Sequence, residues 1–207
     1  MNINININIK NINNKDFSHA RHFAIKGMNL HWYTTGKLQL YLYSHYFWKL
    51  ELLKATRAIG AYNGDTLMGV LLISMTGQPR IYNSLPSRIY VAVFEWIMNN
   101  FFGETTGVYD RVNEVMLRKM KENFEPDGEL NFFAVAPEAK GQGIGTMLLT
   151  KLKELEKGRL IYLFTDSGSS YRFYQKKGFM EAGRQKITMK IGQKDIDLEC
   201  FLFYLSL

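Results

Sequence analysis

The stretch NFFAVAPEAKGQGIGTMLL, residues 131–149, is the part of the chain that decides the fold. It begins with apolar residues typical of a strand, passes through a proline and three glycines, and continues as an amphipathic helix. Glycines at positions 141, 143 and 145 leave backbone N–H groups uncovered where the helix begins. Because the helix dipole also favours an anion there, the stretch predicts a phosphate or pyrophosphate cradle between a strand and a helix.

Three kinds of anion-binding loop compete for this stretch. A P-loop ends in Gly-Lys followed by Ser or Thr, whereas Gly145 and Thr146 follow each other without the lysine. A dinucleotide fingerprint follows its strand directly and has a third glycine where this chain has Thr146. The arrangement Lys140-x-x-Gly143-x-Gly145 resembles the Arg/Gln-x-x-Gly-x-Gly/Ala motif of the GNAT superfamily of acetyl-CoA-dependent N-acetyltransferases.

A second motif carries the same resemblance. Residues 170–179, SYRFYQKKGF, resemble the family's helix and turn with the pattern Phe-Tyr-x-x-x-Gly-Phe. The two motifs lie within 129–179, roughly a quarter of the chain, and the N-terminal half matches the family only in its order of elements. The chain departs from the family at Lys140, where lysine still attracts phosphate as a point charge, and at Ser167, where many members have Asn beside the pantetheine arm.

The fold that the resemblance implies is α/β (α+β), with a mixed, mostly antiparallel sheet, splayed central strands, helices on both faces and a helical insertion before the central strand. The hydrophobic pattern agrees with this order of elements, and an Asn-Gly pair at 63–64 predicts a β-hairpin. We expect strands at 5–12, 55–62, 66–75, 129–135, 160–165, 180–191 and 197–205, and helices from about 16 to 28 and at 41–54, 143–157 and 169–177. The first few residues are expected to be loose.

Composition bounds the remaining choices. The 207 residues suit a single domain, 1–207. We interpret the segment at about 79–124 as a helical insertion in this domain. The net charge of +7 comes from scattered basic residues with acids interleaved, so we expect no nucleic-acid partner. No apolar stretch approaches the length of a membrane span, and a single cysteine favours a reducing, cytoplasmic location.

The resemblance also implies roles for individual residues. Tyr174 aligns with the tyrosine of the family motif and is the candidate general acid for the departing thiolate. Glu129 lies where some members carry a catalytic glutamate, and is the candidate base acting through a water. Alternation along the strand predicts one common face for Glu129, Asn131, Phe133 and Val135. The candidate acetyl-CoA-binding residues are Phe133, Ala134, Val135, Lys140, Gly141, Gln142, Gly143, Ile144, Gly145 and Thr146.

Other chemistry-bearing residues have plainer explanations. His19 and His22 have no further ligand at a suitable spacing, so we expect no metal site. Cys200 falls in an apolar strand and is expected in the core. Residues 27–33, between the first two helices, are candidates for acceptor recognition.

The leading hypothesis is an N-acetyltransferase that binds acetyl-CoA and an amine acceptor in a ternary complex. Two alternatives stay open, namely a catalytically idle acyl-CoA-binding or regulatory module and a nucleotide-binding protein. The acceptor is also left open among antibiotics, polyamines, amino acids, peptides and protein N-termini. The insertion at 79–124 is either a lid over the acceptor pocket or a homodimer surface.

Overall fold

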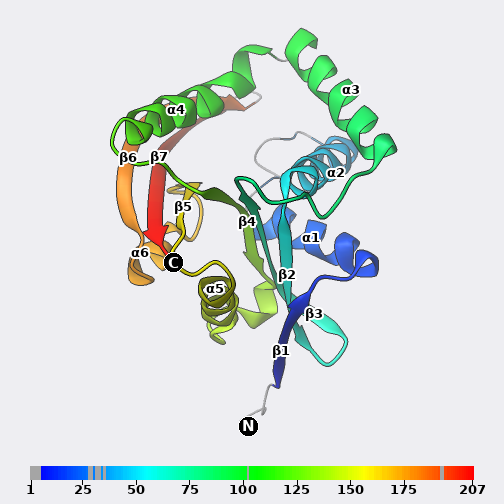
Figure 1. Cartoon of the computed structure of the whole chain (residues 1–207). Helices are drawn as coiled ribbons and strands as arrows, with labels where there is room; N and C mark the ends of the chain where they lie inside the picture. The colour runs from blue at the N-terminus through cyan, green and yellow to red at the C-terminus, as the bar shows by residue number, and fades with distance from the viewer. Residues whose placement is uncertain (1–5, 28–29, 31–33, 35, 102, 192–193) are drawn as a thin grey trace.

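A twisted β-sheet forms the centre of the molecule (Figure 1). The computed structural model describes the chain except for residues 1–5, 28–29, 31–33, 35, 102 and 192–193. Within the described residues the sheet has seven strands in the order β1-β2-β3-β4-β5-β7-β6. The strands are β1 Ile7–Asn11, β2 Arg57–Asn63, β3 Thr66–Met75, β4 Gly128–Val135, β5 Leu160–Asp166, β6 Met180–Ile191 and β7 Lys194–Ser206.

Helices cover both faces of this sheet. The first two helices and α4 lie on one face, and α5 and α6 lie on the other (Figure 1). The α-helices are α1 Phe17–Gly27, α2 Lys37–Lys54, α3 Leu85–Phe101, α4 Gly103–Lys121, α5 Ile144–Leu155 and α6 Tyr171–Lys176. The predicted mixed, mostly antiparallel sheet with helices on both faces is therefore confirmed, and the 79–124 region contains α3 and α4, directly before β4.

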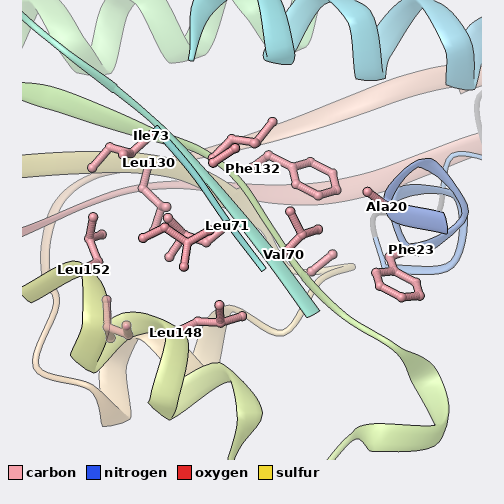
Figure 2. Packing of buried hydrophobic residues seen from close by; sticks show 14 of the residues in the cluster. Ala20, Phe23, Val70, Leu71, Ile73, Leu130, Phe132, Leu148 and Leu152 are labelled. Atoms are coloured by element: carbon pink, nitrogen blue, oxygen red, sulfur yellow. The ribbon is translucent and has the colours of Figure 1, made fainter. Parts of the chain in front are cut away.

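The main core is built around β3 and β4. Figure 2 shows Leu148 and Leu152 of α5 pointing toward the strands from one side, and Phe23 of α1 lying on the other. A separate apolar cluster forms where Met116 and Met120 of α4 pack on Leu202 of β7. The second cluster fixes α4 on the β6–β7 half of the sheet, so each half of the sheet has its own apolar cluster.

The sheet opens between its two central strands. β4 and β5 are the parallel pair of the sheet, and they pair only at Gly128↔Ile161 and Glu129↔Tyr162. Beyond these positions β4 runs on to Val135 and β5 to Asp166 without pairing to each other. This confirms the expected splay of the central strands.

A β-bulge in β4 corrects one expectation from the sequence. The register with β3 shifts between Leu72↔Phe132 and Ser74↔Glu129, so two residues of β4 stand opposite one of β3. A bulge breaks the two-residue alternation of side chains. Asn131 consequently reaches Glu51 of α2, whereas Phe133 contacts Phe173 of α6, and the predicted common face of Glu129, Asn131 and Phe133 is wrong.

The remaining differences between expected and observed elements are small. The helix expected at 41–54 begins earlier, at Lys37, and the final strand also begins earlier, at Lys194. The looseness expected for the first few residues concerns 1–5, which lie outside the described residues. No helix within the described residues is long and apolar enough to cross a membrane.

Candidate active site

The glycine-rich turn folds into an open cradle at the start of α5. Gly141 and Gly143 have φ values of +83° and +80°, in the left-handed region that side chains strongly disfavour. Gly145 lies in the first turn of α5, where a Cβ would come within 3.3 Å of the Phe173 ring and 3.6 Å of Phe133. Each of these three positions therefore has its own physical reason to require glycine.

The cradle presents unused backbone donors. Among the described residues, no main-chain acceptor takes the N–H groups of Gly143, Ile144, Gly145 or Thr146, and the first helical bond runs from Met147 N–H to the Gly143 carbonyl. Unpaired N–H groups at a helix N-terminus bind anions, and Lys140 adds an exposed positive charge beside them. Gly141 and Gln142 complete the loop, so the residues present fit a phosphate-bearing ligand.

The end of β4 offers a second binding element. Phe133, Ala134 and Val135 pair with β3 along one edge, at Leu71, Val70 and Gly69. Their other edge faces the opening toward β5 and pairs with no strand of the described residues. An extended ligand can hydrogen-bond to such an edge in the way an added strand would.

Tyr174 of α6 lies beside this opening. Its ring lies 6.2 Å from the Phe133 ring and 5.5 Å from the Phe179 ring, centroid to centroid. Burial raises the pKa of the Tyr174 phenol well above its ordinary value, and its hydroxyl has no hydrogen-bond partner within the part of the chain described. The phenol is therefore protonated at neutral pH.

Glu129 lies at the closed end of the opening. Its Oε2 accepts a hydrogen bond from the Tyr162 hydroxyl at 3.3 Å. Burial raises the pKa of the Glu129 carboxyl, and the nearby carboxylate of Glu51 raises it further. A carboxylate whose pKa is shifted toward neutrality is a stronger proton acceptor than an ordinary surface glutamate.

Two neighbours of Glu129 were missed by the sequence reasoning. Glu51 of α2 is 7% exposed and accepts a hydrogen bond from Asn131 Nδ2 at 2.7 Å, and burial raises the pKa of its carboxyl. Tyr162 faces Glu129 only because of the strand register. The sequence signal for Glu51 was a single acid within the strongly aromatic helix 41–54, whereas nothing local pointed to Tyr162.

The structure does not bring all of the predicted site residues into contact with one another. No contact joins Glu129 to Tyr174 among the described residues. Ser167 is engaged elsewhere, since its Oγ accepts a hydrogen bond from the Glu199 N–H at 3.0 Å. Cys200 is fully buried, as expected, and burial together with Asp166 raises the pKa of its thiol to about 12. Most of the predicted acceptor segment 27–33 lies outside the described residues.

Comparison with known proteins agrees with this geometry. Residues 86–181, from the start of α3 into β6, match the family model of the acetyltransferase (GNAT) domain. The matched segment includes both motifs that resemble the GNAT superfamily, at residues 140–146 and 170–179. No curated protein matches the chain.

Solved GNAT-like structures match over nearly the whole chain. A structure described as histone acetyltransferase HPA2 and related acetyltransferase from Corynebacterium glutamicum is 16% identical, covers 96% of this chain and 94% of its own, and has a TM-score of 0.58. An N-acetyltransferase from Staphylococcus aureus is 13% identical, with 97% and 98% covered and a TM-score of 0.52. The yncA protein of Salmonella typhimurium, solved with its cofactor acetyl-CoA, is 12% identical, with 97% and 94% covered and a TM-score of 0.50. At these identities the likeness shows the fold alone, and it covers more of the chain than the segment that matches the family model.

Proposed function

We propose that this protein is an N-acetyltransferase that moves an acetyl group from acetyl-CoA directly to a primary amine in a ternary complex. The observation that carries the proposal is the separation of β4 from β5 immediately after Glu129↔Tyr162, with the cradle at the far end of the same strand. A thioester-bearing ligand can lie along this opening with its phosphates at the cradle and its reactive end toward Glu129. Acetyl-CoA supplies an activated acyl carbon in that position.

The binding part of the proposal uses mainly main-chain groups. Phe133–Val135 would hydrogen-bond to the pantetheine arm through the free edge of β4. The amides of Gly143–Thr146 and the Lys140 ammonium would hold the pyrophosphate. Because these donors belong to the backbone, glycine at positions 141 and 143 serves binding by allowing the loop geometry.

Glu129 is the base in this proposal. An amine is mostly protonated at neutral pH and must lose a proton before it attacks. Glu129 takes this proton through a water, and the raised pKa of its carboxyl suits that task. Tyr162 holds the carboxyl in place through its hydroxyl, and Glu51 contributes the negative charge that helps to raise the pKa.

Tyr174 is the acid. Its hydroxyl is protonated and free of hydrogen-bond partners among the described residues, so it can donate to the sulfur of the leaving thiolate. The aromatic rings of Phe133 and Phe179 fix its position.

Release of free CoA thiol from acetyl-CoA, measured with a panel of amines, tests the proposal. We expect amine-dependent release and tight calorimetric binding of CoA but not of ATP. Binding of CoA without release for any amine would instead favour an idle acyl-CoA-binding module. Preferential binding of ATP would favour a nucleotide-binding protein.

We also propose that residues 1–207 form one acetyltransferase domain in which α3 and α4 are an insertion, and that it works in the cytoplasm without a nucleic-acid partner. The presence of a single, buried cysteine supports a reducing compartment. Limited proteolysis tests the first point, since a single domain yields no stable fragment that ends between α4 and β4.

A further inference from the structure

Two adjoining cavities lead from the surface to Glu129. The first, about 530 Å³, lies between α2 and α3. The second, about 390 Å³, lies between the end of α2 and the strands β3 and β4, and Glu129 and Tyr162 are part of its lining. Lys54 and Arg80 line both cavities, so the two cavities adjoin, and we call them together the β4-entry groove. Each cavity has a volume typical of small-molecule sites.

Cations from four parts of the chain line the β4-entry groove. Lys54 comes from α2, Arg80 from the segment before α3, Arg88 from α3 and Lys121 from the end of α4. Lys54 forms an ion pair with Glu51 at 3.4 Å. Within the described part of the chain, the side chains of Arg80, Arg88 and Lys121 form no ion pair or hydrogen bond.

The lining of the groove contains fewer acids than cations. Glu95 lies in the cavity between α2 and α3, where its Oε1 accepts a hydrogen bond from the Tyr46 hydroxyl at 3.3 Å. Glu129 lies in the cavity that reaches β4. A ligand in the cavity at β4 therefore meets the Glu129 carboxylate together with Arg80 and Lys121, and Arg88 lines the adjoining cavity.

This groove is separate from the acetyl-CoA cradle. It reaches β4 at Gly128 and Glu129, whereas the cradle follows Val135, about 20 Å further along the strand at 3.3 Å per residue. The phosphates of a ligand held at Gly143–Thr146 would be too far away to neutralise Arg80, Arg88 or Lys121. These cations are therefore available to a different molecule.

We propose that the acceptor enters through the β4-entry groove and carries an anionic group, a carboxylate or a phosphate, in addition to its amine. This inference rests on the proposed acetyltransferase function and specifies its substrate class. The amine lies at Glu129, and the anion is bound by Arg80 and Arg88, whose guanidinium groups suit the planar oxygens of carboxylate and phosphate. Lys121 and Lys54 add positive charge without fixed geometry.

Matched acceptors test the proposal by isolating the anion. The carboxylate pair is 4-aminobutyrate and 4-aminobutanamide, and the phosphate pair is O-phosphoethanolamine and ethanolamine. Initial rates of CoA release are compared at equal concentrations of free amine and low salt, so that differences in amine pKa do not enter. We expect kcat/KM at least tenfold higher for the anionic member of one pair, and the pair showing it identifies the anion.

The variants Arg80→Ala and Arg88→Ala separate anion binding from catalysis. Each variant should raise the KM for the anionic acceptor about tenfold. The KM for the neutral acceptor and the KM for acetyl-CoA should stay unchanged. Arg118→Ala is the matched control, because Arg118 is an exposed arginine of α4 outside the lining of both cavities. Arg118→Ala should change the KM for neither the anionic nor the neutral acceptor.

A binding measurement covers the case in which none of these amines is acetylated. Calorimetry in the presence of CoA should detect the anionic acceptor, and Arg80→Ala should weaken its binding. Neutral amines acetylated as well as anionic ones would overturn this inference and leave the acetyltransferase function standing. Absence of both turnover and anion binding would overturn the inference as well, and absence of CoA binding would overturn the proposed function itself.

Discussion

Glu129 and Tyr162 face each other at the last paired position of β4 and β5, and the Tyr162 hydroxyl donates a hydrogen bond to the Glu129 carboxylate at 3.3 Å. The strands separate directly beyond this pair. The polar pair therefore marks the closed end of the opening, and burial raises the pKa of the carboxyl that we propose takes the proton from the amine.

Glu129→Gln should lower kcat by about 10²-fold, within the range typical of general-base catalysis. In the wild type the rate should fall on the acid side at a pH above the ordinary titration range of glutamate, because the pKa of Glu129 is raised. The variant should lose this acid limb. A pH–rate profile that keeps the limb would remove Glu129 from proton transfer.

Tyr174→Phe should lower kcat by about 10²-fold, at the lower end of the range for loss of a general acid, with the KM for acetyl-CoA unchanged. The hydroxyl has no partner within the described residues, so its removal should not lower the melting temperature. Steady-state kinetics and a thermal melt check both points. Unaltered turnover would exclude Tyr174 as the acid.

Gly143→Ala should weaken CoA binding at least tenfold and destabilise the fold by about 1–2 kcal/mol, the usual cost of a left-handed residue with a side chain. Gly158→Ala is a matched control, since Gly158 has the same φ of +80° and equally open space but lies beyond the other end of α5. Calorimetry with CoA and chemical denaturation compare the two. Equal losses of CoA binding in both variants would argue against a cradle.

Glu51→Gln should stabilise the protein at neutral pH. Burial raises the pKa of this carboxyl in the folded state, so the folded protein binds its proton more tightly than the unfolded chain does. The stability from this group is fully present below its ordinary pKa and is lost as the pH rises through the folded pKa. Glutamine can still accept the hydrogen bond from Asn131 and carries no charge. Thermal melts from pH 4 to 8 should show a smaller decline with pH in the variant, and an identical pH dependence would contradict the shift.

Glu156→Ala should destabilise the protein by about 3 kcal/mol, because it removes a buried carboxylate and leaves its partners unpaired. Glu156 is 4% exposed and binds Arg57 at 2.7 Å and Gln78 at 2.9 Å, tying the end of α5 to β2 and to the segment after β3. Lys151→Ala, which removes an exposed ion pair with Glu154, should change the stability by less than about 1 kcal/mol. Urea denaturation of both variants checks the contrast.

The sequence predicted the parts of this molecule that depend on local chemistry. Apolar periodicity, the Asn63-Gly64 turn and the three glycines of the cradle indicated most elements and their order. The β4 bulge was missed, because it arises from the way β4 pairs with β3, a segment distant in the sequence, and the prediction assumed unbroken alternation along β4. The pairing of Glu129 with Tyr162 and its proximity to Glu51 were also missed, since both arise from strand register and helix packing between distant segments.

The most direct test of the central claim is a two-substrate initial-rate study with mass spectrometry of the product. We predict equimolar CoA and N-acetylated amine, intersecting lines in the double-reciprocal plots and no acetylated protein, as direct transfer in a ternary complex requires. Parallel lines with a protein adduct of acetyl mass, or bound CoA with no acetylated amine, would contradict the account.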